Sequence, residues 1–385
     1  MRSIFSTFFI ILLFPPFAYS QSQIEFEKLV GENVATQSIT YAIKQDSIGN
    51  IWIGSEEGVL KHNSKFYQIY NTYNGLPESV SNRVTEVFID SKQRIWIGLE
   101  KGVCLYNEAL DRFELVGDKA EINPTLVEAI FEDSEGNIWI GGFNGLWKYN
   151  VDNPDRTLSR LVTNQSIQAI NIFEGNLILG AKKGLFVYDM SIDKLRKVKL
   201  PQNKRNISSI NFFDDFALIG TKTGDIFRTS YKFKNLQLVS FERALSIPIN
   251  DIVLDKEGHY YIATDGDGLY YAQNDFSIIN HFKEDSNNQK SISSNGIYDL
   301  ELGNENILWV ATYGGGVNYF DSNHLPFQKI QHEINESNSL AVNFTRAIAK
   351  DKNGNLWFGT KSGISICDKH YTKWKHFENL SKNKN

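Results

Sequence analysis

Residues 133–145 read DSEGNIWIGGFNG, and the rest of the chain repeats this short pattern. Each copy has an aspartate turn, an apolar triplet that usually centres on Trp, a small residue, and a Gly a few positions later. Close copies lie at residues 46–58, 90–102 and 351–363, and degenerate copies at residues 177–184, 217–224, 260–268 and 308–316. The chain therefore contains eight related repeats.

The small residue after each triplet gives the length of the repeat. It stands at Gly54, Gly98, Gly141, Gly180, Gly220, Ala263, Ala311 and Gly359, so successive repeats lie 39 to 48 residues apart. A period of about 40–50 residues built from short β segments is typical of a β-propeller, with one four-stranded blade per repeat. The sequence therefore predicts an all-β propeller of four-stranded antiparallel blades.

One repeat shows how the pattern makes a blade. Residues 39–45 form a first strand, and residues 46–49 form a turn in which the Asp side chain accepts backbone N–H bonds and Gly takes a positive φ. Residues 51–53 are apolar on both faces, which predicts a second strand covered on both sides by neighbouring blades. Gly54 leaves room where strands converge near the axis. Residues 59–63 and 66–70 complete the blade.

Two details of the repeat carry structural expectations. The Trp residues of the triplets lie in a strand that is apolar on both faces, so we expect inter-blade core rather than a platform for sugar stacking. They are Trp52, Trp96, Trp139, Trp309 and Trp357. Gln93 replaces the turn Gly of the second repeat, so that turn must differ or be strained.

The pattern D-x-x-G-N-[IL]-W-[IF]-G, with preceding spacers such as residues 70–84 and 335–344, resembles the two-component regulator propeller repeat. The resemblance covers residues 24–385. It implies the periplasmic sensor region of hybrid two-component systems, many of which detect oligosaccharides. Family members carry two seven-bladed propellers, an immunoglobulin-like domain, a membrane helix and a kinase. We expect either a fragment of such a sensor or a free-standing propeller, and we assign it no kinase activity.

The number of blades depends on how the ring closes. Residues 26–30 look like an outer strand that precedes every blade, so we expect them to close the ring on the last one. Closure on the seventh repeat predicts a propeller at residues 21–324 and leaves residues 325–385 as an eighth repeat. In that case residues 327–332 open a second propeller. The alternative is an eight-bladed ring, in which residues 375–380 compete with residues 26–30 for one edge.

The N-terminal segment and the composition predict the compartment. Residues 1–20 read as a signal peptide, with Arg2, an apolar run and a small-x-small site before Gln21. A net charge of −5 without a basic block gives no support to nucleic-acid binding. We find no membrane anchor, and we expect a periplasmic or secreted protein. Cys104 and Cys367 are expected to be separate buried thiols rather than a disulfide.

The turn between the second and third strands varies from repeat to repeat while its surroundings stay constant. In a propeller these turns share a face with the loops that link blades, which predicts a recognition surface on a rigid scaffold. Exposed aromatic residues suit stacking on a sugar ring, carboxylates accept hydroxyl hydrogen bonds, and lysines favour an acidic group. The candidate ligand-binding residues are Phe143, Tyr313, Tyr73, Glu56, Glu100, Asp265, Asp267, Lys182 and Lys222.

The sequence leaves three functions open. The first is an exported sensor that binds an oligosaccharide and signals through a second propeller or another partner, and the second is a protein–protein scaffold without catalysis. The third is a propeller hydrolase or lyase, in which Glu56, Glu100 and Asp265 meet as acid and base. Residues 265–268 read as a Gly-rich turn rather than a calcium loop. We expect no enzyme, metal or cofactor.

Overall fold

The computed structural model describes residues 25–29, 38–63, 66–117, 124–152, 158–201, 206–213, 215–230, 233, 236–239, 245–321, 330–332, 337–369 and 373–378. The predicted signal peptide at residues 1–20 lies outside the described residues. So do residues 327–329 of the predicted opening strand, and the described residues 330–332 are not in a strand.

The described residues form eight four-stranded antiparallel sheets. The first four blades follow the chain from the innermost to the outermost strand. Blade 1 contains β2 (Thr40–Gln45), β3 (Ile51–Ser55), β4 (Gly58–His62) and β5 (Tyr67–Tyr70), and blade 2 contains β6 (Val84–Ile89), β7 (Ile95–Leu99), β8 (Val103–Asn107) and β9 (Arg112–Leu115). Blade 3 contains β10 (Val127–Glu132), β11 (Asn137–Gly142), β12 (Gly145–Asn150) and β13 (Ser159–Val162), and blade 4 contains β14 (Ile167–Phe173), β15 (Asn176–Ala181), β16 (Gly184–Asp189) and β17 (Lys194–Lys197).

Three more blades and a separate sheet complete the fold. Blade 5 contains β18 (Ile207–Phe213), β19 (Phe216–Thr221), β20 (Ile226–Thr229) and β21 (Gln237–Leu238), and blade 6 contains β22 (Ile249–Leu254), β23 (Tyr260–Thr264), β24 (Leu269–Ala272) and β25 (Ile278–Phe282). Blade 7 contains β26 (Ile297–Leu302), β27 (Ile307–Thr312), β28 (Gly316–Asp321) and β1 (Glu27–Lys28). The eighth sheet contains β29 (Thr345–Lys350), β30 (Leu356–Thr360), β31 (Gly363–Cys367) and β32 (Trp374–Glu378).

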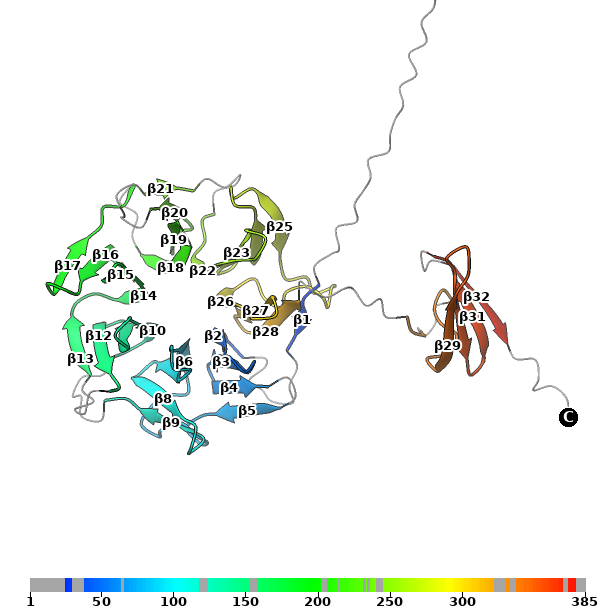
Figure 1. Cartoon of the computed structure of the whole chain (residues 1–385), viewed down its shortest axis with the longest axis horizontal. Helices are drawn as coiled ribbons and strands as arrows, with labels where there is room; N and C mark the ends of the chain where they lie inside the picture. The colour runs from blue at the N-terminus through cyan, green and yellow to red at the C-terminus, as the bar shows by residue number, and fades with distance from the viewer. Residues whose placement is uncertain are drawn as a thin grey trace, which may run out of the picture. The chain divides into compact units, whose positions relative to one another are not determined.

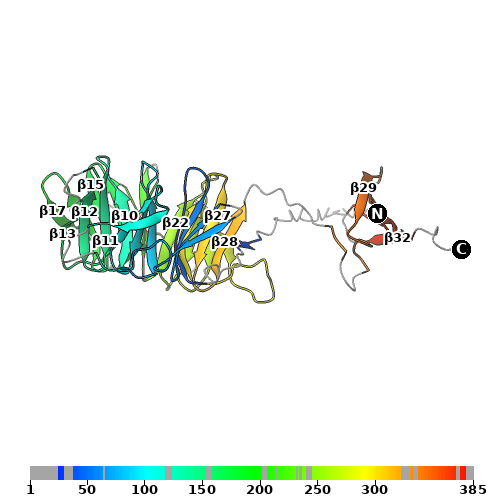
Figure 2. The ribbon, with the colours of Figure 1, turned by 90° about the horizontal axis from the view of Figure 1, so that it is seen from below.

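The seven blades form a closed ring, which confirms the predicted fold (Figure 1). The innermost strands contact one another in succession, and β26 of blade 7 contacts β2 of blade 1. Strand β1 adds to the outer edge of β28, with Glu27 opposite Tyr319 and Lys28 opposite Asn318. The N-terminal strand therefore closes the ring on the seventh blade, and the eight-bladed alternative is wrong. Figure 2 shows that the strands run between the two faces of the ring.

The chain divides into two compact units, residues 1–323 and residues 324–385. The first contains the ring, and the second contains the eighth sheet. In the second unit β32 pairs with β31. The strand that the eight-bladed alternative places at the edge of the ring therefore belongs to the eighth sheet.

The small residue after the triplet is required by the next blade. A Cβ on Gly141 would lie 2.7 Å from Ile167 Cγ2 in blade 4, and one on Gly98 would lie 2.5 Å from Val127 Cγ1 in blade 3. Real Cβ atoms do not approach so closely, because close-packed interiors leave no room for an added methyl group. Glycine at this point therefore lets β-branched side chains of one first strand pack against the second strand of the preceding blade.

The turn Asp and the Trp six residues later form one structural unit. Asp133 Oδ1 accepts the backbone N–H groups of Glu135 and Asn137, and its Oδ2 accepts the Trp139 indole N–H at 2.8 Å. Blades 1 and 2 repeat the indole bond at 2.9 and 2.8 Å. The carboxylate thus fixes the turn and supplies the acceptor that a buried indole requires.

Four of the five triplet Trp residues are buried core, as the pattern predicts. Trp52, Trp96, Trp139 and Trp309 are each less than a tenth exposed. Trp357 contradicts the prediction, because 39% of its surface is exposed. The described residues of its unit form one sheet, so a strand that is apolar on both faces remains partly uncovered there.

Gln93 and the two cysteines follow the sequence analysis. Gln93 adopts φ 61°, in the same positive range as Gly49 and Gly136 at the equivalent turns. The turn is therefore the same as in the other repeats, and Gln93 occupies a strained conformation. Cys104 and Cys367 are both buried free thiols.

Candidate ligand-binding site

Every innermost strand of the ring has a β-bulge at its second residue. In blade 1 the pairing passes from Thr40 directly to Ala42, and in blade 7 it passes from Ile297 directly to Asp299. The extra residue is unpaired, so its side chain is aimed differently from those of its neighbours. The seven bulge residues are Tyr41, Thr85, Glu128, Gln168, Ser208, Asn250 and Tyr298.

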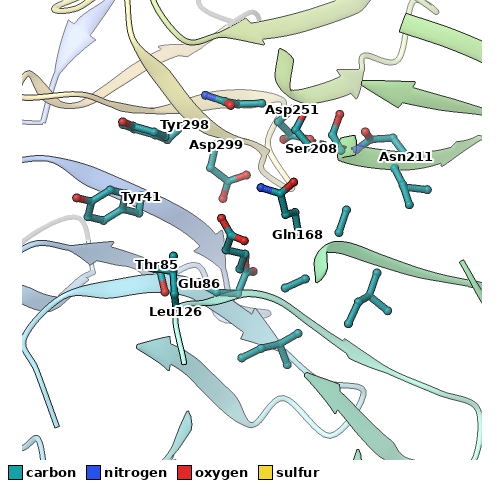
Figure 3. Close-up of a pocket in the computed structure, with 18 of the residues that line it drawn as sticks. Tyr41, Thr85, Glu86, Leu126, Gln168, Ser208, Asn211, Asp251, Tyr298 and Asp299 are labelled. Atoms are coloured by element: carbon teal, nitrogen blue, oxygen red, sulfur yellow. Dashed lines mark hydrogen bonds between the residues drawn. The ribbon is translucent and has the colours of Figure 1, made fainter. Parts of the chain in front are cut away.

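All seven bulge residues line one pocket on the axis of the ring, with a volume of about 430 Å³ (Figure 3). Arg83, Leu126 and Lys222 also line it. We call the end of the ring that carries the second-to-third-strand turns the turn face. The entries to the first strands lie at this end, because turn residues Glu56 and Tyr313 donate their amide N–H to Ile39 and Gly296. The pocket therefore adjoins the turn face.

Tyrosines line one side of the pocket, where blades 7 and 1 meet. The rings of Tyr41 and Tyr298 are 5.3 Å apart, and those of Tyr298 and Tyr313 are 6.1 Å apart. The Arg83 guanidinium lies 4.9 Å from the centre of the Tyr41 ring. Tyr41 donates its hydroxyl to Glu56 Oε2 at 2.6 Å, so burial and this hydrogen bond together raise the pKa of Tyr41. We call Tyr41, Tyr298 and Tyr313 the tyrosine strip.

Three polar bulge residues bond their blades to the next blade. Thr85 Oγ1 donates to the Val127 carbonyl at 2.6 Å, and Ser208 Oγ donates to the Ile249 carbonyl. Asn250 Nδ2 donates to the Ile297 carbonyl at 2.7 Å. Each of these bonds joins a bulge to the first residue of the next first strand. The pocket wall is therefore bonded from blade to blade and preorganised.

Charged residues gather further along the first strands, away from the turn face. Lys44 Nζ lies 3.1 Å from Asp299 Oδ2 and 3.4 Å from Glu301 Oε2. Glu86 and Asp251 contribute two more carboxyl groups from blades 2 and 6. Figure 3 shows Glu86, Asp299 and Gln168 directed toward one another in the middle of the pocket. We call Lys44, Glu86, Asp251, Asp299 and Glu301 the axial charge cluster.

Burial and mutual repulsion shift the pKa values in this cluster. Burial and the Asp299 carboxylate raise the pKa of Asp251 to about 7, although Lys44 and hydrogen bonds from Ile252 and Asn211 oppose the shift. The same two causes raise the pKa of Glu86 well above its usual value. Burial lowers the pKa of Lys44, but Asp299 and Glu301 outweigh it and raise the pKa overall.

The structure brings four of the predicted residues to the pocket region, and these are Tyr313, Glu56, Lys222 and Asp265. Tyr313 continues the tyrosine strip, and Glu56 joins it through Tyr41 and through Arg83, whose Nε lies 3.6 Å from Glu56 Oε2. Lys222 lines the pocket and donates to Asn250 Oδ1 at 2.8 Å. Burial lowers the pKa of Lys222, and the negative charges of Glu128 and Asp265 partly oppose this shift.

The other predicted residues lie elsewhere. Phe143, Glu100 and Lys182 occupy exposed turns on the turn face and are not part of the pocket wall. Asp267 makes its contacts within its own blade. Its carboxylate accepts a hydrogen bond from Tyr270, pairs with Lys283 and lies 3.8 Å from His281 Nε2. Tyr73 is 95% exposed and follows β5, the outermost strand of blade 1. The adjacent Gly75 carbonyl accepts from Phe113 in the outermost strand of blade 2, so this loop lies at the outer rim.

The sequence analysis missed the bulge residues. A signal existed: the residue after the first strand's opening Thr, Val or Ile reads Tyr, Thr, Glu, Gln, Ser, Asn, Tyr from blade 1 to blade 7. This position varies as strongly as the turns do. If side chains alternated regularly along the strand, this side chain would lie on a face of the sheet. The β-bulge instead directs all seven of these side chains toward the axis.

Two kinds of feature are absent from the described part of the chain. No group of three or more His, Cys, Asp or Glu residues there is arranged to hold a metal ion. No helix there is long and apolar enough to cross a membrane.

A seven-bladed β-propeller with an axial pocket is therefore the class of protein that the fold and the site define. The family model described as the two-component regulator propeller matches residues 33–57, 121–144 and 339–362. The chain carries repeats of this family, and the resemblance inferred from the Asp turn and the triplet is confirmed. No curated protein matches the chain.

Solved structures share the fold. The extracellular domain described as part of a hybrid two-component system from B. thetaiotaomicron is 20% identical with a TM-score of 0.65, covering 94% of this chain and 55% of that one. A second such domain from B. thetaiotaomicron is 22% identical with a TM-score of 0.66, covering 92% and 54%. The chain thus spans about half the length of these relatives. Virginiamycin B lyase from Staphylococcus aureus is 12% identical with a TM-score of 0.60, covering 78% and 99%.

Proposed function

We propose that the protein is an exported sensor that binds an oligosaccharide in the axial pocket, next to the turn face. The observation that carries the proposal is the tyrosine strip on one side of a polar pocket. Aromatic faces suit the apolar faces of sugar rings, and polar groups opposite them suit the hydroxyls. The extracellular domains that share the fold support a location in the periplasm or outside the cell.

The two sides of the pocket contact different parts of the sugar. A sugar ring stacks on Tyr41 and Tyr298, while Glu128, Gln168 and Lys222 bond its hydroxyl groups from blades 3, 4 and 5. The Oε1 atom of Gln168 is buried without a hydrogen-bond partner among the described residues, so it is available to a hydroxyl donor. Phe143, which is 61% exposed on the turn face, would contact a longer ligand that extends out of the pocket.

Signalling would follow from the rigid wall of the pocket. Side chains from neighbouring blades are bonded across it, so a ligand that bridges blades 7, 1 and 3 resists changes in blade spacing. Such a ligand changes the contacts that the ring makes with a second propeller or another sensor partner. The sensor acts without catalysis, and its carboxylates orient the ligand.

A glycan array followed by calorimetric titration of the whole chain tests the proposal. The Tyr298→Ala, Tyr313→Ala double variant should lose at least about ten-fold in affinity, since each aromatic contact is worth roughly 0.5–1.5 kcal/mol beyond its buried area. The matched control is Tyr73→Ala, which removes an equally large but remote tyrosine and should bind like the parent. Equal loss in the double variant and in Tyr73→Ala would contradict the pocket assignment.

The same experiment separates the rival functions. A parent protein that binds no glycan, but is captured by a defined periplasmic domain, would favour the non-catalytic scaffold. Chromatography of the titrated glycan after prolonged incubation tests for a hydrolase or lyase. We expect the glycan unchanged, and a shortened or unsaturated product would replace the sensor proposal.

A further inference from the structure

The axial charge cluster has more carboxyl groups than cations. Lys44 Nζ contacts Asp299 and Glu301 and donates to the Ile43 carbonyl, so its ammonium group already has its acceptors. Asp251 accepts hydrogen bonds from Asn211 and from the backbone N–H groups of Ile252 and Leu300, all of them uncharged. The Glu86 carboxyl accepts no hydrogen bond from the described residues, although it is directed into the pocket (Figure 3).

We infer that the pocket holds an ammonium group of its ligand beside Glu86 and Asp251, so that the ligand is an amine-bearing sugar rather than an acidic one. This inference rests on the proposed function and names the ligand class. The cluster already holds one ammonium group, that of Lys44, which donates to the Ile43 carbonyl at 2.9 Å and to Asp299 at 3.1 Å. A second ammonium group would meet the same kind of acceptors on the opposite side.

Three alternatives fit the pocket less well. A divalent cation requires several oxygens about 2.3–2.6 Å from one point, and the described residues contain no such group. An anionic sugar at this depth would meet the carboxyl groups of the cluster, whose one cation, Lys44, is already paired with Asp299 and Glu301. Lys222 and Arg83 line the pocket closer to the turn face. A neutral hydroxyl leaves the repulsion between the carboxyl groups unrelieved.

Binding of an ammonium group should release protons. A cation favours the ionised form of a nearby carboxyl group, and the pKa values of Glu86 and Asp251 are raised by burial and by Asp299. Lys44 and Asp299 face both carboxyl groups, and Asn211 donates to Asp251. Glu301 lies on the other side of Lys44, and Glu128, Lys222 and Arg83 line the pocket closer to the turn face. Affinity for the amine should therefore rise with pH while the amine stays protonated.

Matched trisaccharides test the ligand class on the whole chain. The probes are cellotriose, its 6-amino-6-deoxy derivative and its 6-carboxyl derivative, which differ only at one carbon. The amine should bind about ten-fold more tightly than the alcohol, and the carboxylate more weakly than either. Calorimetry in two buffers of different ionisation enthalpy should show proton release for the amine alone. Equal affinities for amine and alcohol, or a preference for the carboxylate, would overturn the inference.

Variants locate the effect, and a second measurement is independent of any sugar. Glu86→Gln should remove most of the preference for the amine, whereas Glu100→Gln, the same change in an exposed turn, should keep it. Methylammonium chloride should lower the titration midpoint of the Glu86 carboxyl, followed by ¹³C NMR, relative to sodium chloride at equal ionic strength. A midpoint that does not move overturns the subsite, even if neutral sugars bind. Binding of methylammonium without binding of any glycan would preserve the subsite and refute the oligosaccharide sensor.

Discussion

At the scale of single residues, the turn aspartate explains why the repeat can be recognised in the sequence. Its carboxylate bonds two backbone N–H groups and the indole six positions later, so Asp and Trp must occur together at one spacing. Blade 7 breaks the rule, since Gly303 stands six residues before Trp309. The Trp309 indole N–H is buried and has no acceptor among the described residues.

Gly303→Asp should therefore stabilise blade 7 relative to Gly303→Ala. Both variants place a Cβ 2.4 Å from Gln45 Oε1, the far end of a flexible side chain, which accepts the Asn304 N–H and must move equally in both. Only Asp offers an acceptor to Trp309, and a buried unsatisfied donor costs about 1–3 kcal/mol. Urea denaturation of the two variants measures the difference. If Gly303→Asp is the less stable of the two, the turn carboxylate does not act as described.

Trp139→Ala should destabilise the ring by roughly 3–5 kcal/mol, because a large buried aromatic side chain is removed. Trp139 is 1% exposed and packs edge-on against Tyr188 of the next blade, with ring centres 5.9 Å apart. Trp357→Ala is the matched control, since Trp357 makes the same bond to Asp351 but is much more exposed. Thermal denaturation should show a large loss for the first variant and leave the main transition unchanged for the second. Unchanged melting with lost ligand binding would instead make Trp139 a site residue.

At the scale of elements, the first strand of each blade needs space beside the second strand of the preceding blade. Gly141 provides it in blade 3, as Gly54 and Gly98 do in blades 1 and 2. Gly359 occupies the same position in the eighth sheet, where the nearest atom to an added Cβ is Ala347 Cβ of its own sheet at 3.4 Å. The same sequence position is therefore crowded in the ring and open in the second unit.

Gly141→Ala should lower the stability of the ring by about 1–3 kcal/mol, the usual effect of overpacking. The added methyl group meets Ile167 Cγ2 at 2.7 Å and the Ile167 carbonyl oxygen at 3.1 Å, and the backbone oxygen cannot easily move. Gly359→Ala makes the same chemical change where the nearest atom is 3.4 Å away, at ordinary contact distance, and should be nearly neutral. Chemical denaturation compares the two, and equal effects would show that inter-blade contact is not the reason for glycine here.

The sequence predicted the blades much better than the pocket. Strand positions followed from apolar triplets and turn residues, as in residues 39–45 and 51–53, because these patterns are local. The tyrosine strip joins Tyr41 to Tyr298 across the closure of the ring, and nothing local connects them. Turn residues such as Phe143 vary from repeat to repeat, but variation does not reveal distance from the axis. Trp357 is more exposed than its repeat predicts, because the sequence of a repeat does not show whether another blade packs against it.

At the scale of the whole molecule, the axial charge cluster makes stability depend on pH. The pKa of Asp251 is about 7 in the folded ring, above the usual value of about 3.9. The folded state therefore binds this proton more tightly, and the free energy of unfolding should fall as pH rises from about 4 to about 7. Glu86, Glu128 and Glu301 have raised pKa values too and act in the same direction.

Asp251→Asn should flatten this dependence. The variant keeps an uncharged group beside Asp299 at every pH, so its stability relative to the parent should increase between pH 4 and pH 7 by more than about 1.4 kcal/mol, the equivalent of one pKa unit. Urea denaturation at several pH values measures the change. Asp265→Asn, in an exposed turn, is the control and should follow the parent. Parallel profiles for the parent and Asp251→Asn would contradict the assigned pKa shift.

The pairing of β1 with β28 also sets an order of events during synthesis and export. Glu27 leaves the ribosome almost three hundred residues before its partner Tyr319, yet neither can complete blade 7 alone. Blades 1 to 6 are built from consecutive strands and can assemble as the chain emerges. The edge of β28 and the buried ring of Phe26, which packs against Phe282 and Phe320, must find each other last. Contacts so distant in the sequence form slowly, and until they do the outer edge of β28 stays open to a strand from another chain.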